Sequence, residues 1–299
     1  PPRSTLFPYT TLFRSTHLFG FYSTFNPDAI KDVELIKGGF PAEYGGRMSA
    51  VLDLVQRDGN RNHFAGKASL GLISSRVTLE GPLGNGSWFL GGRRTYIDLL
   101  TSLIETEQSP LPSYYFYDFN GKITQDLTPS DKISLSGFLA RDQMDFTSKS
   151  DLTLGVGVSN RAAALGWTHV FSGSLFSEFH ASWSDYSNTL DNERRGFGGV
   201  IDNQITDITL KGKVDWFASS DLTVTTGFEG SRYALRYLQE FGGGADSTGA
   251  EETQPDIDTE DEVYSGFGQA NYRLSERFSV QPGLRVNYYR VREDRKSVV

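Results

Sequence analysis

The sequence has no cysteine and only four histidines among its 299 residues. Without thiols the chain can form no disulfide scaffold, no cysteine-ligated zinc or iron–sulfur centre, and no thiol nucleophile. It also has no run of eighteen apolar residues, which excludes a transmembrane helix. A membrane β-barrel stays open, because barrel strands alternate in polarity and average to a polar sequence.

Sequence motifs typical of catalytic or metal-binding sites are equally scarce. The histidines, at positions 17, 63, 169 and 180, show no metal-binding spacing, and no serine lies in a Gly-x-Ser-x-Gly setting. His169 and His180 flank one predicted turn and would be neighbours across a hairpin. The acidic balance, with 37 Asp and Glu against 29 Lys and Arg, argues against nucleic acid as a partner. We therefore expect no enzyme activity and no cofactor.

The two ends of the chain do not fit the rest. Residues 1–15 repeat Thr-Leu-Phe and Arg-Ser, follow no helix or strand period, and lack the apolar core of a signal peptide. They resemble translated sequencing-adapter sequence, and residues 295–299 resemble the same kind of read-through. We expect both ends to be artefacts and the native protein to extend beyond them.

Residues 26–58 predict a compact unit with one helical turn and two strands. Asn26 is a favourable N-cap, Pro27 suits the first helical position, and Asp28 suits the positive end of a helix. The apolar runs 33–36 and 48–55 predict strands, and two glycine pairs bracket an irregular loop between them. Such glycines allow positive φ and close approach of the backbone.

From residue 62 onward, apolar and polar side chains alternate with a period of two. One example is the run in which Phe179, Ala181 and Trp183 alternate with polar residues. Runs that are apolar on one face only are what the wall of a membrane β-barrel requires, and we count about eleven of them.

The connections between these runs alternate in length. Short turns are predicted at 81–86, 127–131, 171–174, 217–221 and 274–277, and long loops at 92–113, 144–155, 187–200 and 239–261. Residues 96–105 have a helical apolar spacing and predict a short helix in the first loop. Aromatic residues beside the short turns predict a girdle at one rim: Trp88, Phe89, Trp167, Phe171, Phe176, Trp216, Phe217 and Phe278. A soluble β-sandwich also alternates, but predicts neither one-sided long loops nor rim aromatics.

Three motifs follow one another between residues 28 and 54. They are Ile-x-x-Val-Glu-Leu-x-Lys-Gly, then Tyr-Gly-Gly-Arg, then Val-Leu-Asp-Leu. Together they resemble the end of the plug domain of TonB-dependent outer-membrane receptors. The matching residues are Glu34, Lys37, Gly38, Gly39, Tyr44, Gly45, Gly46 and Arg47. The form of 38–47 is similar to the subgroup with an N-terminal carboxypeptidase-regulatory-like domain, and weaker similarities extend the resemblance over residues 18–294.

The resemblance implies an all-β fold, a transmembrane antiparallel β-barrel of which about 11 of 22 strands are present, preceded by the C-terminal part of an α/β plug domain. Residues 16–60 would belong to the plug and 61–294 to the barrel. In intact receptors, charges such as Glu34 and Arg47 would pair with the barrel wall.

The implied function is active import of a bulky nutrient, such as a metal chelate, a corrinoid or an oligosaccharide, across the bacterial outer membrane. The implied partners are the TonB complex, reached through a TonB box upstream of this chain, outer-membrane lipid and lipopolysaccharide, the transported ligand, and a surface lipoprotein. A passive porin and, less well supported, a barrel enzyme are the alternatives.

Two further groups are candidates for binding. Arg93, Arg94, Tyr114 and Tyr115 border the first long loop and could contact a ligand, although the tyrosines fit a membrane-interface belt better. Asp256, Asp258 and Glu260 lie in an acidic segment and could offer oxygen atoms to Ca²⁺. A solvated acidic loop without a metal is the favoured alternative for this segment.

Overall fold

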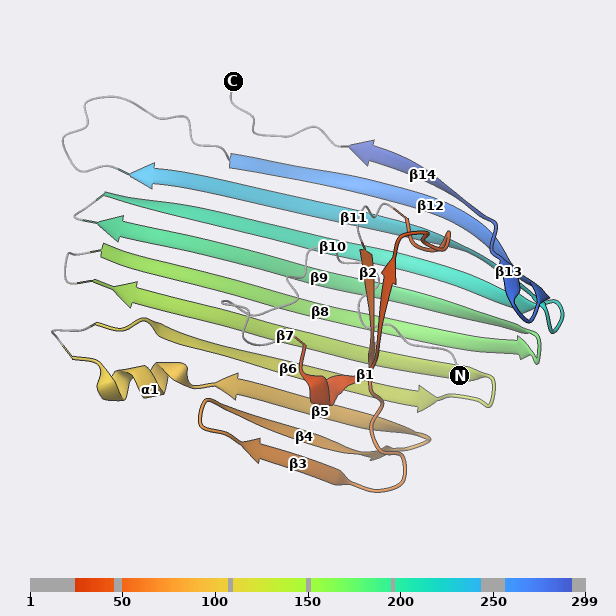
Figure 1. The fold of residues 1–299 in the computed structure, drawn as a ribbon, viewed down its shortest axis with the longest axis horizontal. Coiled ribbons are helices and arrows are strands. Elements are labelled where there is room, and N and C mark those ends of the chain that lie inside the picture. The colour runs from red at the N-terminus through yellow and green to blue at the C-terminus, as the bar shows by residue number, and fades with distance from the viewer. Residues whose placement is uncertain are drawn as a thin grey trace.

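The structure is a computed structural model that describes residues 25–45, 50–106, 110–148, 152–194, 197–242 and 256–291. Most of this is one 12-stranded antiparallel sheet in which each strand, apart from the last two, pairs with the next along the chain (Figure 1). Its strands are β3 (Ala65–Leu70), β4 (Ser74–Leu83), β5 (Gly86–Thr95), β6 (Ser113–Asp126), β7 (Asp131–Thr147), β8 (Leu152–Ser172), β9 (Leu175–Arg194), β10 (Phe197–Phe217), β11 (Leu222–Gly242), β12 (Asp256–Ser275), β13 (Phe278–Val280) and β14 (Gly283–Val291).

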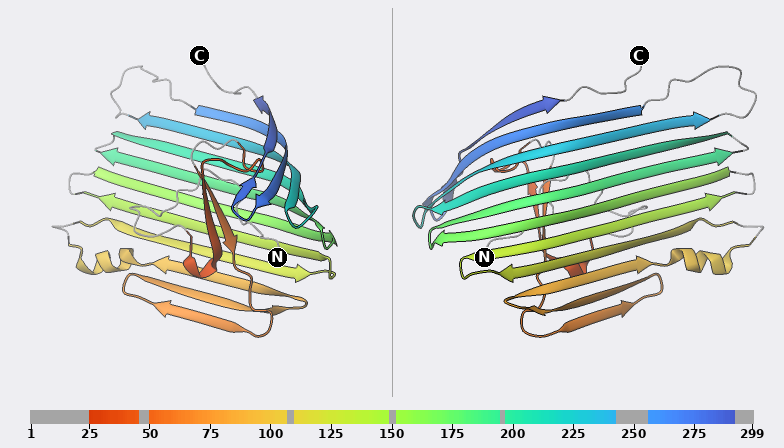
Figure 2. Two further views of the ribbon diagram at one scale, coloured as in Figure 1. Left: turned by 45° about the vertical axis from the view of Figure 1, so that its right-hand side comes forward. Right: turned by 180° about the vertical axis from the view of Figure 1, so that it is seen from behind.

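The last two strands form one interrupted edge of the sheet. Both β13 and β14 pair with β12, and they are separated by Gln281 and Pro282. Proline has no amide hydrogen to donate to a ladder, which explains the break. Counted as one, they bring the sheet to the predicted number of about eleven strands. A single curved sheet, rather than two packed sheets, excludes the β-sandwich alternative (Figure 2).

All the predicted short turns lie at one end of the sheet, which we call the turn end, and the opposite end is the loop end. At the loop end the predicted loops at 144–155 and 187–200 are wrong, because β7 to β10 continue as paired strands through most of these residues. In the predicted loop 239–261, paired strand likewise extends to residue 242 and resumes at 256. Residues 187–194 are mostly polar on both faces, which concealed this extension from a pattern that looks for one apolar face.

The first long loop contains the predicted helix, α1 (Ile97–Ile104), which lies beside the outer part of β6. No helix in the described part of the chain is long and apolar enough to cross a membrane.

The two faces of the sheet have opposite character. On the outward face large apolar side chains are exposed, among them Leu135, Leu165, Trp183, Leu210 and Phe228. On the inward face polar and charged side chains are buried, including Asp118, Asn120, Lys122, Thr124, Glu178, Thr209, Lys211, Asp215 and Glu229. This is the reverse of the usual arrangement in a water-soluble protein, in which large apolar residues are mostly buried and charged residues mostly exposed.

The rim aromatics follow this division with three corrections. Trp167, Phe171, Trp216 and Phe278 are between 42% and 59% exposed near the turn end, as a girdle requires. Phe217 lies two residues after the inward Asp215 and stacks on Phe176 with ring centres 5.6 Å apart, so it belongs to the inward face. Phe89 is completely buried, because its place in β5 turns it to the inward face with Ser87. Phe176 pairs with Asp215 on that same face, so it does not belong to an outward girdle either.

A small second sheet crosses the inward face (Figures 1 and 2). It consists of β1 (Ile30–Lys37) and β2 (Ala50–Gln56), preceded by the 3-10 turn η2 (Pro27–Ala29). The Asn26 side chain accepts the amide hydrogen of Asp28, which confirms the predicted cap. We call β1, β2 and the loop between them the inner hairpin, and residues 57–64 the connection that leads from it to β3.

Close backbone packing in β5 gives a test of the sheet. A Cβ atom added to Gly86 would lie 1.7 Å from the carbonyl oxygen of Thr124, whereas one added to Gly173 would meet nothing within 4 Å. Gly86→Ala should therefore lower the free energy of unfolding by about 1–3 kcal/mol, because β5 and β6 must separate. Gly173→Ala is the matched control and should be near neutral in denaturant unfolding in detergent. Equal effects of the two variants would contradict the register.

Candidate functional site

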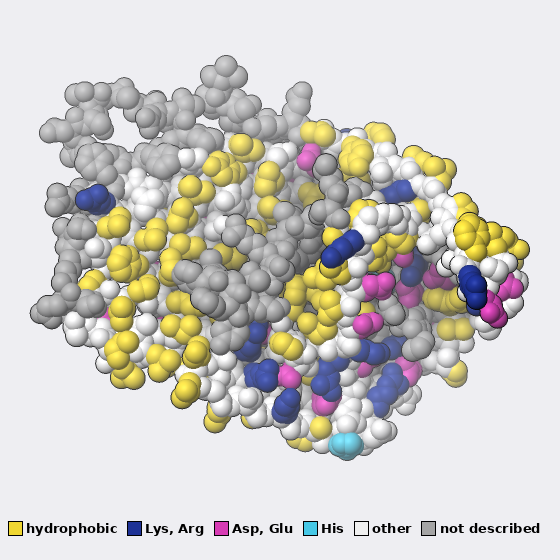
Figure 3. Space-filling model, in the orientation of Figure 1, with side chains coloured by type: hydrophobic (Ala, Val, Ile, Leu, Met, Phe, Trp, Pro, Cys, Tyr) yellow, Lys and Arg dark blue, Asp and Glu magenta, His cyan; other side chains and the backbone are white. Residues whose placement is uncertain are grey.

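The inner hairpin is fastened to the sheet at its two ends by charged side chains. The connection cluster comprises Asp28, Arg57 and Asp58 against strands β3 to β7. The loop cluster comprises residues 42–45 against strands β10 to β14. The hairpin thus bridges two distant parts of one curved sheet. The space-filling view shows charged side chains gathered around it on the inward face (Figure 3).

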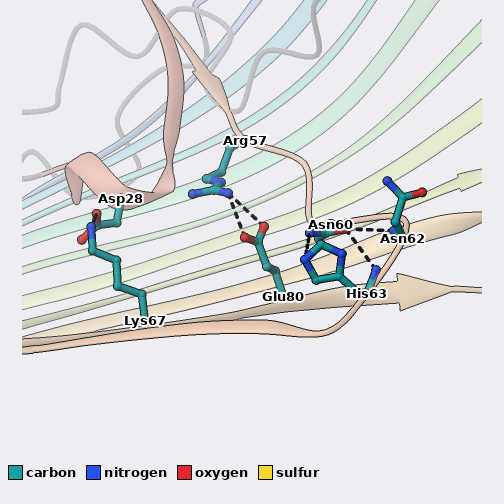
Figure 4. Close-up of polar contacts among 7 residues, drawn as sticks. All are labelled: Asp28, Arg57, Asn60, Asn62, His63, Lys67 and Glu80. Atoms are coloured by element: carbon teal, nitrogen blue, oxygen red, sulfur yellow. Dashed lines mark hydrogen bonds and ion pairs between the residues drawn. The ribbon is translucent and has the colours of Figure 1, made fainter.

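In the connection cluster, three ion pairs hold the turn and the connection to the first strands, and Figure 4 draws those of Lys67 and Glu80. Asp28 accepts from Lys67 at 3.2 Å and from Arg76 at 3.1 Å. Arg57 donates to both carboxylate oxygens of Glu80 at 3.0 Å, and its guanidinium lies 5.4 Å from the ring centre of Phe89. Both bonds come from the same nitrogen, Nη2, so one charged donor is shared between the two oxygens.

Asp58 neutralises the most deeply buried cation of this cluster. The Lys122 side chain, only 3% exposed, donates to the Asp58 carboxylate at 2.8 Å and to the carbonyl of Gln56 at 3.0 Å. Thr124 donates to the same carboxylate at 3.1 Å, and Lys132 lies 3.8 Å away. A buried ammonium requires such partners, because desolvation alone would strongly disfavour its charge.

In the loop cluster, Glu43 lies between two lysines of β10. Its carboxylate is 3.6 Å from the ammonium of Lys211 and 3.8 Å from that of Lys213. Lys213 also pairs with Glu178 at 3.3 Å, and the Lys211 ammonium lies 5.4 Å from the ring centre of Tyr44. One carboxylate of the hairpin therefore contributes to an ion network that belongs mainly to the sheet.

Backbone contacts complete this attachment. The amide of Ala42 donates to the Gln269 side chain at 2.8 Å, and Arg285 donates to the carbonyl of Glu43 at 3.1 Å while pairing with Glu229. A Cβ atom at Gly45 would collide with the Arg285 side chain. Glycine at this position therefore permits the arginine to lie across the loop.

The hairpin and the sheet enclose a cavity of about 220 Å³ beside the loop cluster. Its polar lining comes from the hairpin, through Glu34, Glu43 and Asp53, and from the sheet, through Glu178, His180, Lys211 and Lys213. Among the described residues there is no group of three or more acidic or histidine side chains suited to hold a metal ion. The cavity is a charged space between the hairpin and the sheet.

Glu43 of the hairpin loop and Asp58 of the connection have opposite pKa shifts. Burial raises the pKa of Glu43, with Asp215 and Glu34 adding to the effect, although Lys213 opposes it. Burial alone would also raise the pKa of Asp58, but the ammonium and hydrogen bond of Lys122 outweigh it and bring the pKa below its usual value. The docked arrangement therefore stabilises the ionised form of Asp58 and destabilises the ionised form of Glu43.

The structure places the described residues of the predicted plug motif in the hairpin. Gly38 and Gly39 have φ values of 63° and 44° and turn the chain from β1 into the loop, which follows Lys37 at the end of that strand. Glu34 lines the cavity, and Tyr44 and Gly45 contact the sheet. Gly46 and Arg47 lie outside the described residues, so the predicted pairing of Arg47 stays a prediction.

The candidate ligand residues of the first loop divide between the two faces. Arg93 is buried inward beside Asp118 and Phe116, and Tyr114 donates to Asp142 on the same face. Arg94 is exposed, pairs with Asp98, and lies over the ring of Tyr115. Alternation along β5 and β6 causes this separation, and a role in ligand binding stays a prediction.

Two other expectations change. The three candidate calcium ligands, Asp256, Asp258 and Glu260, lie at alternate positions along β12. The carboxylate of Glu260 forms an ion pair with Arg232 at 2.6 Å, so the three carboxylates do not converge on one calcium ion. His169 and His180 are not neighbours, because His169 pairs in register with Ser177 and contacts Asp131, whereas His180 pairs with Gly166 and lines the cavity. Their odd and even positions place them on opposite faces.

Sequence reasoning missed the residues that carry the attachment. It singled out Glu34 and Arg47, but Asp28, Glu43, Arg57 and Asp58 make the ion pairs that the structure describes. The available signal was charge at inward positions of otherwise alternating strands. Lys122, Lys211 and Lys213 lie on the inward face of the sheet. On a face open to solvent, these lysines would need no ion-pair partner.

Removal of one carboxylate should expose the role of the connection cluster. Asp58→Asn leaves the buried Lys122 ammonium without its charged partner, and should lower the free energy of unfolding by about 1–3 kcal/mol. Glu276→Gln, an equivalent change in the exposed turn before β13, should have little effect. If thermal unfolding in detergent shows the same change for both variants, the cluster does not stabilise the fold.

The two clusters should respond to pH in opposite directions. Docked Glu43 binds a proton more tightly than free Glu43, so the loop cluster is favoured at low pH and weakens as pH rises through the raised pKa. Docked Asp58 binds a proton less tightly, so its contribution is present above 3.8 and is lost as pH falls through the lowered pKa. Hydrogen exchange at 40–45 and 57–59, corrected for intrinsic rates, should show these trends. Glu43→Gln should remove only the first, and parallel trends at both ends would refute the assignment.

Comparisons with known proteins agree with this geometry in fold. No family model and no curated protein matches the chain. Three similar solved structures are FpvA of P. aeruginosa bound to pyoverdines (TM-score 0.70, 12% identity, 95% of this chain and 44% of that one), the copper transporter OprC (0.69, 12%, 94% and 45%), and a mutant of the ferric enterobactin receptor PfeA from Pseudomonas aeruginosa (0.64, 17%, 90% and 46%). The chain spans less than half the length of these structures. It has the fold of the TonB-dependent receptors, over part of their β-barrel.

Proposed function

We propose that the chain is part of a receptor that imports a bulky ligand across the bacterial outer membrane by TonB-dependent active transport. The sheet forms part of the barrel wall, and the inner hairpin is the end of the plug. The observation that carries this proposal is the charged attachment of the hairpin at both ends to the inward face of the sheet. A wall that only enclosed an open channel would have no use for such a segment.

The outward face supports a position in a membrane. In β10 it is apolar over residues 208–216, close to the about 9–11 residues that a tilted strand needs to cross the hydrocarbon core. The exposed aromatics near the turn end fit one membrane interface. Long strands at the opposite end would then project beyond the other interface toward the exterior.

The nature of the attachment supports a plug that can move. The apolar cluster between hairpin and sheet is small, with Leu54 against Phe138, Ala140 and Ala162, and Phe25 and Ile30 packed beside it. Among the described residues, both clusters attach the hairpin through ion pairs and hydrogen bonds, which water can replace when the two surfaces separate. Ligand binding would act by favouring a plug state that exposes the TonB box to the energy-transducing complex, which is a population shift between two states.

The ligand class is open among a metal chelate, a corrinoid and an oligosaccharide. The names of the similar structures mention copper, pyoverdine and ferric enterobactin. The TonB complex, a surface lipoprotein and outer-membrane lipid are the other proposed partners. Catalysis has no support in this arrangement, since His169 and His180 lie on opposite faces of the wall.

A reversible tether tests the proposal. The chain has no native cysteine, and a Cβ atom at Gly283 would lie 2.9 Å from that of Ala42, so Ala42→Cys with Gly283→Cys can join the hairpin to the sheet after a small adjustment. In the full-length receptor, uptake from a panel of ferric chelates, copper, corrinoids and oligosaccharides should depend on TonB. It should be at least about tenfold lower when the disulfide is oxidised, and recover on reduction.

The single-cysteine variants are the controls and should transport normally under both conditions. Uptake that continues without TonB, or that is unchanged by the tether, would favour a passive channel instead.

A further inference from the structure

The inward face of the sheet loses its charges toward the loop end. From Asp207 onward in that direction, no inward residue of β10 or β11 is charged. In Figure 3 the left-hand part of the molecule, which is the loop end, accordingly shows mainly hydrophobic and neutral side chains. We use the name neutral patch for six inward residues of β9 to β11, namely Tyr186, Asn188, Asn203, Ile205, Leu235 and Tyr237.

The outward face of the same strand segments is charged. Asp185, Asp202 and Arg236 occupy outward positions that alternate with those of the neutral patch. Nearer the turn end the order is the opposite, with an apolar outward face and charged residues inward. Solvent on both sides of a projecting wall would permit charge on both faces. The lack of charge on the inward face therefore indicates contact with an uncharged partner.

The polar side chains of the neutral patch have unused capacity for hydrogen bonds. Within the described part of the chain, the side chains of Tyr186, Asn188 and Asn203 make no hydrogen bond. On the outward face of the same strands, by contrast, the amide of Gln204 donates to Asp185 at 2.7 Å. The amides of the neutral patch are therefore available to a group that is not part of this sheet.

A buried amide in β8 adjoins the neutral patch. Asn160 pairs in register with Tyr186 and is the diagonal neighbour of Asn188. Its side chain belongs to a residue that is only 4% exposed, and its Oδ1 atom has no hydrogen-bond partner among the described residues. Because a buried carbonyl oxygen without a donor costs free energy, a donor supplied by a ligand would stabilise this position.

The register joins these groups into one continuous surface. Asn188 pairs with Asn203, and Asn203 pairs with Tyr237 on its other side. Side chains directly opposite each other in an antiparallel pair have Cβ atoms about 4.5–5.5 Å apart. The aliphatic border includes Leu235 and Ile257, which are 37% and 39% exposed. One ligand can therefore contact amides, tyrosine rings and aliphatic side chains together.

The inward cations nearer the turn end offer little to an anionic ligand, because they are already paired. Lys213 lies 3.3 Å from Glu178, and Arg285 lies 3.4 Å from Glu229. An anion that entered from the loop end would first lose water at the neutral patch and would then meet balanced ion pairs. Desolvation of a charge without a counter-charge opposes its binding.

We propose that the neutral patch, with Asn160, is a specificity subsite that selects an uncharged, hydroxyl-rich ligand and discriminates against anionic chelates. The inference rests on the proposed import function and narrows its ligand class to a neutral oligosaccharide. Hydroxyl groups both donate and accept hydrogen bonds, and the asparagine amide offers donors and an acceptor without charge. The tyrosine rings and aliphatic side chains would cover the apolar faces of the sugar rings.

The test measures ligand binding to the full-length receptor in detergent by titration calorimetry. The probes are neutral oligosaccharides of several linkages, uronate-containing oligosaccharides of the same length, cyanocobalamin and an anionic ferric triscatecholate. A neutral oligosaccharide should bind, and its uronate counterpart should bind at least about tenfold more weakly. Asn188→Leu with Asn203→Leu should weaken binding of the neutral ligand about twenty-five-fold, because each hydrogen bond lost contributes about a factor of five.

Gln204→Leu is the matched control, because it removes an amide one residue away on the outward face, and it should bind like the wild type. Asn188→Ser with Asn203→Ser adds no apolar bulk and should reproduce the loss in a protein whose thermal unfolding is unchanged. The proposal is overturned if both double variants bind like the wild type, or if Gln204→Leu loses as much. Tighter binding of the ferric chelate or of cyanocobalamin than of every neutral oligosaccharide would also overturn it.

Uptake by cells separates this inference from the proposed transport function. TonB-dependent uptake of an anionic chelate, without uptake of any neutral oligosaccharide, would reject the neutral ligand and support the transport function. Uptake of a neutral oligosaccharide that is lost in both double variants but does not require TonB would support the subsite and reject active transport.

Discussion

The structure depends on pairing charges that face inward. An exterior made apolar by Leu135, Leu165 and Leu210 leaves the polar residues of an alternating strand on the concave side, where Lys122, Lys211 and Glu178 are buried. Buried charges need partners of opposite sign, because desolvation would otherwise remove their charge or disrupt the fold. Within the sheet Glu178 meets Lys213, but Lys122 obtains its carboxylate from Asp58 of the connection. The wall and the hairpin are therefore electrostatically incomplete without each other.

This constraint explains how the attachment can be specific and, in the proposed plug movement, still be released. Ion pairs such as Asp58 with Lys122 define the position of the hairpin through direction and charge, since a misplaced hairpin would leave a buried ammonium unpaired. Removing the hairpin admits water, which solvates the same groups. The opposite pKa shifts of Glu43 and Asp58 make the two ends unequal: the charge is favoured at the connection and disfavoured at the loop. At neutral pH, ionised Glu43 therefore stabilises the docking of the loop cluster less than ionised Asp58 stabilises the docking of the connection cluster.

If the wall lies in a membrane as proposed, the outward face follows a second constraint, the thickness of the hydrocarbon core. Strands β7 to β12 are longer than a bilayer requires, and their outward residues change from apolar to charged near Arg141, Arg161 and Arg232. The same change concealed the strand extensions from sequence reasoning. The rule of one apolar face holds only within the apolar band, so paired strand at 187–194 was taken for loop. Phe89 was assigned to the wrong face of the sheet for a related reason. Its closeness to the rim follows from the neighbouring turn, but the face to which its side chain points depends on the register of β5.

The sequence by itself determined the class of fold, the number of strands, the cap at Asn26, the short turns and the helix in the first loop. These features follow from local spacing and from backbone preferences, which operate over a few residues. Only the tertiary structure decided which charges meet. Asp58 and Lys122 are 64 positions apart, and Glu43 and Lys211 are much further apart, so no period in the sequence relates them. Their pairing depends on the curvature of the sheet and on the register of strands β6 and β10, which are properties of the assembled wall.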